Sequence, residues 1–339
     1  MPDDPVVRRS AAMEVALPAG RRFAALRRLF GLRDVGVLVA AVLIAAFFAA
    51  ITPSFLTAYN LFNILRQTAE LGIIAMAMTV VIVAGEFDLS VGAIYAVTGV
   101  VAGVLAGRHE GNIWLAALAG MAAAVLLGLV NAVLIATTRI NSFIATLSTM
   151  MVYRGIAMVL SQGQPISFPL SFFMDLFGRA EIGGLLPVPV LWFAGWGVLS
   201  YLFLHRTTLG VRFFATGGNR EAADLAGIRT ARVKTIAFLY TALASGLAAL
   251  ISLSFLKTVT PTQGTGLELE AIAAAVIGGT AMSGGVGSIV GTFLGTFIMA
   301  EVRTGLVLLG TDAYVQDAFV GLVIALAVIV NVRLSMRRR

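Results

Sequence analysis

The chain has 339 residues, of which 59% are hydrophobic and 12% charged, and its mean hydropathy is +0.96. Several separate apolar runs are long enough to cross a bilayer, so the composition indicates an integral membrane protein. Zero Cys excludes disulfides and thiolate metal sites and leaves the redox compartment open. The net charge of +7 would suit a nucleic-acid partner, but the basic residues follow membrane topology instead.

The expected fold class is an all-α polytopic membrane protein. Glycine is abundant, with 36 residues, and no period-2 alternation is sustained, so helices packed through small residues are favoured over barrel strands. At about 20 residues for each span, the hydropathy predicts about ten transmembrane helices. Their predicted ranges are 34–52, 61–84, 89–107, 112–137, 143–161, 187–204, 232–256, 267–282, 286–310 and 314–332.

Charge predicts the orientation of these spans. If the amino terminus is cytoplasmic, 18 of the 24 Lys and Arg residues fall on the cytoplasmic side, as the positive-inside bias requires. A cleaved signal peptide is disfavoured because the basic region is too long and no small-residue cleavage site follows. We therefore expect a basic cytoplasmic tail over 1–33, one transmembrane domain over 34–332, and a second basic cytoplasmic tail over 333–339.

A weak internal repeat lies at an offset of 199 residues, where 71–94 matches 270–293, with Gly85 opposite Gly284 and Gly92 opposite Gly291. Transporters are often built from repeats that frame a central path, although small-residue helices also resemble one another by composition alone. Glycines spaced by four, at 99–107 and at 287–295, predict helix faces on which backbones approach closely.

Catalytic chemistry is not indicated. The glycine-rich stretch 278–288 lacks the Lys that a phosphate-binding loop needs, so it is predicted to be a tight turn between two helices. The two histidines, His109 and His205, stand at predicted span ends and form no nucleophile or metal cluster. We expect no enzyme activity, and no cofactor or metal bound by this chain.

Ionisable residues inside the apolar region are costly, so each should face the bundle interior, a water-filled path or a partner. Candidates for a translocation path or gate are Asp88, Ser90, Arg154, Glu270 and Glu301. For Arg154, a structural pairing with a carboxylate or with backbone carbonyls is favoured over substrate contact. For Asp88, a cap at the amino end of the third span is favoured.

The loop 205–231, between spans six and seven, is the longest polar interruption and is predicted to be cytoplasmic. Asn219 can begin a short helix there, and Gly227 can end it in a left-handed conformation. A small-sided helix suits the groove of another protein, although a solvated connector can carry the same signals. The candidate contact residues are Gly217, Gly218, Asn219, Glu221, Ala222, Ala223, Leu225 and Gly227.

The stretch 217–228, GGNREAADLAGI, resembles the coupling segment of ribose-type permeases of bacterial ABC sugar importers. Further agreement follows in order, with TPSF and NLFNIL at 52–65, DLSVG at 88–92, FIATL at 143–147, and AIAA through GGT to VGT over 271–292. The likeness covers nearly the whole chain after about residue 35. One departure is Glu86, since the family more often has a small residue there.

This resemblance implies a multi-pass protein of the bacterial inner membrane that docks its coupling helix on a cytoplasmic ABC ATPase. ATP and Mg²⁺ would be bound by that ATPase. A periplasmic sugar-binding protein would deliver the substrate, and a second permease copy or paralogue would complete a dimer in the lipid bilayer. ATP hydrolysis on the partner would switch the path between outward and inward access, and no nucleic-acid partner is implied.

Two other classes stay open from the residues. An ion-coupled secondary transporter would use intramembrane carboxylates such as Asp88 or Glu301 and would not need the 205–231 helix. A membrane-embedded enzyme would need nucleophile and base clusters that the sequence lacks. The sequence does not determine which monosaccharide or similar small polyol would be carried.

Overall fold

A computed structural model describes residues 32–109, 111–138, 140–169, 171–183 and 186–336. The predicted tail 1–33 therefore lies outside the described residues except at its last two positions, as do Arg139 and 337–339. The long helices are α2 (Leu32–Ile51), α3 (Ala58–Val83), α5 (Ile113–Thr138), α6 (Ser142–Ser161), α8 (Val188–His205), α11 (Thr230–Leu256), α13 (Ile289–Leu308) and α14 (Ala313–Met336).

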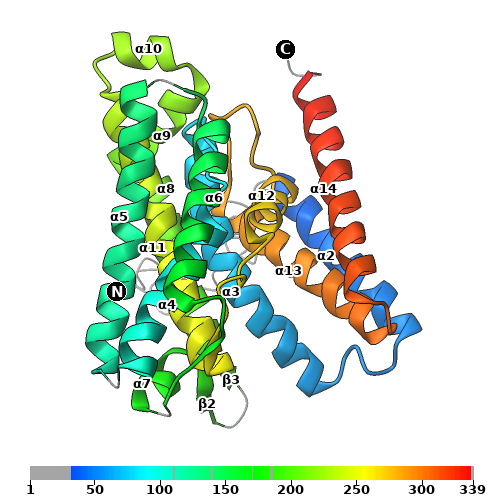
Figure 1. The fold of residues 1–339 in the computed structure, drawn as a ribbon. Helices are drawn as coiled ribbons and strands as arrows, with labels where there is room; N and C mark the ends of the chain where they lie inside the picture. The colour runs from blue at the N-terminus through cyan, green and yellow to red at the C-terminus, as the bar shows by residue number, and fades with distance from the viewer. Residues whose placement is uncertain (1–31, 110, 139, 170, 184–185, 337–339) are drawn as a thin grey trace, which may run out of the picture.

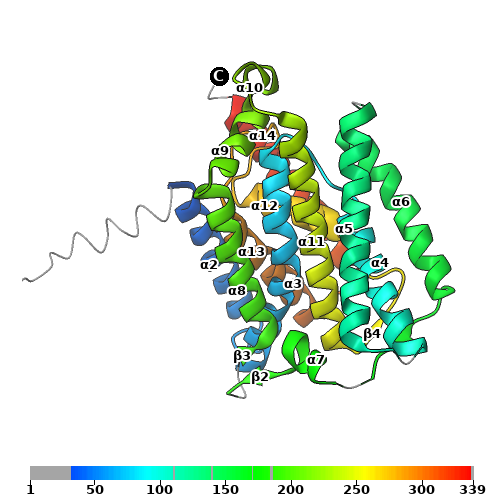
Figure 2. The ribbon, with the colours of Figure 1, turned by 90° about the vertical axis from the view of Figure 1, so that its left-hand side faces the viewer.

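Shorter elements complete the described chain: α4 (Val91–Gly103), η2 (Val104–Arg108), α7 (Phe172–Met174), η3 (Asp175–Arg179), α9 (Thr208–Gly218), α10 (Arg220–Leu225) and α12 (Leu267–Ile277). Two small antiparallel pairs join β1 (Ile166–Ser167) to β4 (Thr258–Val259) and β2 (Glu181–Ile182) to β3 (Leu186–Pro187). Figures 1 and 2 show α10 at one end of the helix bundle and β2, β3 and α7 at the other.

The all-α polytopic prediction is confirmed. Seven of the described helices are long and apolar enough to cross a membrane, and the apolar stretches Val91–Gly107 and Tyr314–Leu326 are shorter. The core centres on α3, because most of its residues from Leu71 to Val83 are fully buried. Helices α11, α12 and α13 pack around it, and the hydroxyls of Thr79 and Thr292 share a 2.6 Å hydrogen bond between α3 and α13.

The predicted span 267–282 differs most from the structure. Helix α12 has only 11 residues, and at about 1.5 Å per residue it covers roughly half of a 30 Å hydrocarbon core. The predicted span begins where α12 begins, but residues 278–282 are not helical, and the backbone over 260–266 before α12 is not helical either. The segment 258–266 runs beside α4, since a Cβ on Gly99 would lie 2.8 Å from Val259 Cγ2 and one on Gly92 would lie 2.2 Å from Gly264 O.

Both glycine faces predicted from four-residue spacing are in close contact with the backbone of another segment. A Cβ on Gly291 would lie 2.0 Å from Gly278 O, and one on Gly295 would lie 2.2 Å from Ala274 O, so α12 rests on α13 through these glycines. On the other face, a Cβ on Gly107 would lie 2.5 Å from Ser167 O. Close packing therefore explains both patterns, with helix α12 against the first face and the β1–β4 pair against the second.

Candidate functional site

The loop predicted to hold a short helix contains two. Helix α9 precedes α10, and Asn219 separates them with an extended backbone. As predicted, the side chain of Asn219 begins α10, because its Oδ1 accepts a 3.0 Å hydrogen bond from Ala222 N. Gly227 has φ +81, which is the left-handed conformation predicted for the residue that follows the helix.

Helix α10 protrudes beyond the bundle (Figure 2) and presents one buried and several exposed side chains. Leu225 is 91% exposed, whereas Ala223 is 4% exposed. Glu221 and Ala222 are exposed beside Leu225. The outer face of α10 therefore carries an unburied leucine, an alanine and a carboxylate, while Ala223 fixes the helix to its own chain.

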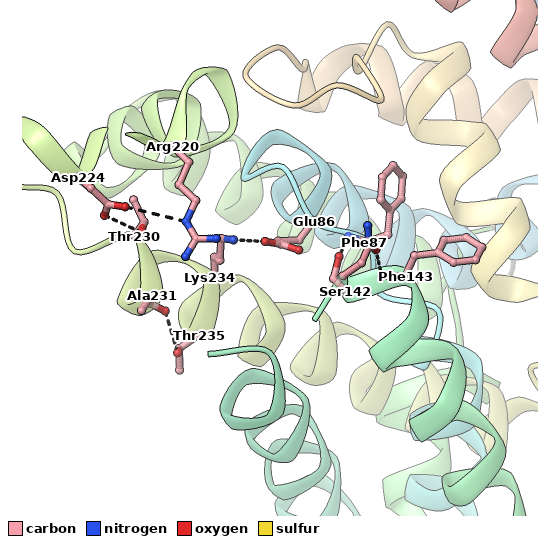
Figure 3. Close-up of polar contacts among 11 residues, drawn as sticks. Glu86, Phe87, Ser142, Phe143, Arg220, Asp224, Thr230, Ala231, Lys234 and Thr235 are labelled. Carbon is pink, nitrogen blue, oxygen red and sulfur yellow. Dashed lines mark hydrogen bonds and ion pairs between the residues drawn. The ribbon is translucent and has the colours of Figure 1, made fainter. Parts of the chain in front are cut away.

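The far end of this loop is tied to the turn that follows α3. Lys234, in the first turns of α11, forms an ion pair with Glu86 (Figure 3), and both side chains are largely buried, at 13% and 9% exposed. Asp224 accepts a 2.7 Å hydrogen bond from the Thr230 hydroxyl, which joins α10 to the start of α11. A cavity of about 260 Å³ lies beside the ion pair and reaches Arg220.

A polar cluster surrounds Asp88, which is fully buried. Its Oδ1 accepts hydrogen bonds from Ser90 N at 3.0 Å and Ser90 Oγ at 2.6 Å, and its Oδ2 accepts one from Thr241 Oγ1 at 2.6 Å. Asn131 donates to Ser90 Oγ at 2.7 Å, and Tyr153 donates to Asn131 Oδ1 at 2.9 Å. We call these five residues the Asp88 cluster; it joins the start of α4 to α5, α6 and α11.

The predicted cap at Asp88 takes a different form. Helix α4 has Ser90 as its first flanking residue, and Asp88 holds the backbone N–H of Ser90 rather than a first-turn N–H of the helix. Burial raises the pKa of the Asp88 carboxyl, and the hydrogen bonds from Ser90 and Thr241 act in the opposite direction. The carboxyl therefore joins the turn before α4 to α11 directly, and Ser90 and Asn131 extend the contacts to α5 and α6.

Arg154 pairs with backbone carbonyls, as the sequence favoured. Its Nη1 donates to Pro261 O at 2.9 Å and to Gln263 O at 2.8 Å. Gln263 in turn donates from Nε2 to Ser252 Oγ at 3.1 Å. The guanidinium of α6 therefore supplies the hydrogen bonds that the non-helical segment 258–266 cannot make to itself.

The candidate carboxylates of α12 and α13 have different surroundings. Glu270 accepts a 2.6 Å hydrogen bond from Arg303 Nη1, and Asp317 lies 3.7 Å from Arg303 Nη2, so α12, α13 and α14 share one ionic group. Among the described residues, the buried Oε2 atoms of Glu301 and Glu268 have no hydrogen-bond partner. Glu268 lies against α4, because its Oε2 would be 2.6 Å from a Cβ on Gly92.

The structure thus brings Asp88 and Ser90 together but gives Arg154 and Glu270 separate sets of contacts. Sequence reasoning missed Lys234 and Thr241 as partners of Glu86 and Asp88. It also left out Asn131, although an amide within the apolar helix α5 is itself a signal of buried polar contact. Glu86, which stands where the family more often has a small residue, forms its ion pair with Lys234.

Known proteins resemble this chain over most of its length. The family model described as "Branched-chain amino acid transport system / permease component" matches residues 60–328. The ribose import permease protein RbsC of Escherichia coli strain K12 is 41% identical over 87% of this chain and 92% of its own length. RbsC of Bacillus subtilis is 40% identical over 83% of this chain and 87% of its own length.

The chain belongs to the ribose-type ABC sugar permeases. More distant members include the xylose/arabinose import permease protein XylH of Sulfolobus acidocaldarius, which is 35% identical over 86% of this chain and 82% of its own length. No solved structure matches this ribose-type permease. Membership confirms the predicted family and makes the chain a non-catalytic transport subunit and a multi-pass protein of the inner membrane, which works with an ATPase and a binding protein.

Proposed function

We propose that this permease forms the translocation path for a monosaccharide or similar small polyol in an ATP-driven importer. A periplasmic binding protein delivers the substrate, and α10 docks on the cytoplasmic ATPase. The observation that carries the docking role is the outer face of α10, where Leu225 is 91% exposed outside the apolar bundle. The names of the relatives, which specify ribose, arabinose and xylose, support a pentose as the first substrate class to test.

The proposed topology has ten membrane-crossing segments with both tails in the cytoplasm. Its support is the arrangement of the described ends. The last turns of α14 lie at the same end of the bundle as α10 (Figures 1 and 2). At the start of α2, Asp34 Oδ1 accepts a 3.0 Å hydrogen bond from Ser288, which lies in the turn between α12 and α13. The single transmembrane domain then extends over 34–332, with basic tails at 1–33 and 333–339.

The proposed docking surface consists of Glu221, Ala222 and Leu225, with Asn219 and Gly227 shaping the helix and Gly217 and Gly218 at its base. Ala223 contributes by holding α10 to its own chain, because its side chain is buried. An exposed apolar side chain beside a carboxylate suits a groove on another protein, where a few anchors supply most of the affinity.

The proposed path runs beside the non-helical segment 258–266 and the short helix α12 that follows it. Non-helical backbone at membrane depth is tolerated where it is buried in protein or lines a water-filled cavity, and such interruptions occur at transporter substrate sites. Arg154 and Glu270 flank this segment through their contacts with Pro261, Gln263 and Arg303. Asp88, Ser90 and Glu301 complete the proposed path or gate, and a second permease copy or paralogue completes the channel as a dimer.

The docking role is tested with Leu225→Asp in the complete importer. We expect the variant to fold but to lose co-purification with the ATPase and at least tenfold in uptake, because a charge replaces the exposed anchor of α10. Ile182→Asp is the matched control, since Ile182 is 50% exposed at the opposite end of the bundle and should retain the ATPase. Wild-type co-purification and uptake in Leu225→Asp contradict the docking role, and uptake driven by an ion gradient without ATP contradicts the importer.

A further inference from the structure

The loop that carries α10 leaves and re-enters the bundle at one place. Gly217 stands just before Asn219, which begins α10, and Lys234 stands in the first turns of α11. Both contact the turn that follows α3, where Gly85 meets Gly217 and the next residue, Glu86, meets Lys234. The two ends of the docking element therefore rest on adjacent residues.

The contact at the first end is backbone against backbone. A Cβ on Gly217 would lie 1.9 Å from Val83 O, 2.8 Å from Gly285 N and 2.9 Å from Gly85 N. Gly285 N also donates to Val83 O at 2.9 Å. Gly85 and Gly284 have φ +83 and +80, so the two turns that match in the internal repeat share a left-handed glycine and both touch Gly217.

We call Gly85, Gly217, Gly284 and Gly285 the glycine joint. It contains no side chain that could adjust, so Gly217 cannot move toward either turn without displacing the backbone of that turn. A larger residue at Gly217 cannot enter without separating them, because the nearest atoms are backbone atoms.

The contact at the second end is electrostatic. Glu86 and Lys234 are both mostly shielded from water, and a buried ion pair is costly to break because removal of one partner leaves an uncompensated charge. Figure 3 shows Lys234 between Arg220 of α10 and Glu86 of the turn. The guanidinium of Arg220 lies 3.9 Å from the carboxylate of Asp224. The ion-pair partner of Glu86 is therefore Lys234, and that of Arg220 is Asp224.

The turn over 84–90 connects the glycine joint and the Glu86–Lys234 ion pair to the rest of the bundle. Two backbone N–H groups of the turn donate to side chains of α6: Phe87 N to Ser142 Oγ at 3.1 Å, and Leu89 N to Thr146 Oγ1 at 3.0 Å. Asp88 and Ser90 then lead to α5 and α11 through the Asp88 cluster. Polar contacts thus join the 84–90 turn to α4, α5, α6 and α11, and the loop that carries α10 meets this turn at Gly217 and Lys234.

We propose that the 84–90 turn receives the movement of α10 and passes it to α4, α5, α6 and α11, with Gly217 and the Glu86–Lys234 ion pair as its two positioning contacts. This inference rests on the proposed docking of α10 on the ATPase. The glycine joint makes the contact rigid, and the ion pair keeps the returning end of the loop aligned with the turn. Both contacts persist through the transport cycle.

The test uses the complete importer in proteoliposomes, with radiolabelled ribose, arabinose or xylose, whichever the wild-type complex imports. Glu86→Lys and Lys234→Glu should each keep the ATPase bound, lower uptake at least tenfold and raise the ATP hydrolysed for each sugar imported. The double exchange Glu86→Lys with Lys234→Glu should recover uptake to within threefold of wild type. Gly217→Ala should resemble the single charge variants, and Gly195→Ala is its control because no atom lies within 4 Å of a Cβ there.

If the wild-type permease does not bind the ATPase, the docking role itself is wrong. If the single variants bind the ATPase and keep the wild-type uptake and the wild-type ratio of ATP hydrolysed to sugar imported, only this inference is wrong. A double exchange no better than either single variant also overturns it. A cysteine pair remains informative if a single charge variant does not fold, because the chain has no native Cys. Cross-linking Glu86→Cys to Lys234→Cys with a short bis-thiosulfonate should raise uptake above the unlinked pair, and a loss of uptake that reductant reverses would show that the contact opens and would refute the proposal.

Discussion

The Asp88 cluster gives a sharp prediction through Thr241→Val. Valine has nearly the shape of threonine, so the substitution removes one hydroxyl and leaves the packing of α11 in place. The hydroxyl donates to Asp88 Oδ2 at 2.6 Å, and both residues are fully buried. The same hydroxyl also lies 2.9 Å from Phe238 O in its own helix, so the double-mutant cycle below is needed to isolate the contact with the buried carboxyl.

The expected cost follows from that contact. A buried acceptor left without its donor loses its compensation for desolvation, which costs about 1–3 kcal/mol. Ser90 still supplies two hydrogen bonds to Oδ1, so the cluster is weakened rather than lost. We expect about 2 kcal/mol of destabilisation, which corresponds to a fall of about 4 °C in apparent Tm at roughly 2 °C for each kcal/mol.

Apparent Tm of the detergent-purified permease is the measurement, taken at one scan rate because membrane proteins often unfold irreversibly. Thr235→Val is the matched control on the same helix, since Thr235 donates only to Ala231 O in an exposed position (Figure 3). It should change stability by no more than about 0.5 kcal/mol.

A double-mutant cycle identifies the partner. In the Asp88→Asn background, Thr241→Val should cost about 1 kcal/mol less than in the wild type, because the amide has one acceptor oxygen where the carboxyl uses two, one for Ser90 and one for Thr241. Equal costs in both backgrounds, or a Thr241→Val variant as stable as the wild type, would refute the idea that Thr241 stabilises the Asp88 carboxyl.

Two further predictions concern other parts of the bundle. Gly72→Ala should destabilise the permease by about 1–3 kcal/mol through overpacking, because a Cβ there would lie 2.1 Å from the Phe193 ring, which is stacked on Phe293 at 4.6 Å; a thermal shift matching that of Gly195→Ala would contradict it. Arg154→Met should speed amide hydrogen exchange across 258–266 and lower uptake, because two carbonyls lose their donor; exchange as slow as in Arg179→Met would count against this.

The predicted spans depend on local physics. A segment in hydrocarbon must satisfy its backbone hydrogen bonds internally, so an apolar run of the right length is enough to specify a helix. The ranges 34–52 and 143–161 therefore agree with α2 and α6 to within two residues at each end. The signals around α10 are equally local, because Asn219 bonds to a residue three positions away and Gly227 needs only its own left-handed conformation.

The interruption before α12 required the folded chain. Residues 258–266 can remain non-helical because Arg154, more than 100 positions earlier, donates to their carbonyls. Hydropathy averages over a window, so it predicted one helix over 267–282, whereas α12 ends at Ile277. The sequence predicted a carboxylate or backbone carbonyls as the partners of Arg154, and the packing of α6 beside this segment decides that they are the carbonyls of Pro261 and Gln263.

The sequence by itself determined the class of protein, its helices and the short capped helix of the polar loop, because burial cost and capping depend on neighbouring residues. Only the tertiary structure decided which distant groups meet: Thr241 with Asp88, Lys234 with Glu86, and Gly217 with Gly85 and Gly284. These contacts join residues far apart in the chain, and their geometry depends on how the helices pack. The sequence predicted a helix at 219–227, and the folded chain holds the loop that carries this helix against the 84–90 turn at Gly217 and Lys234.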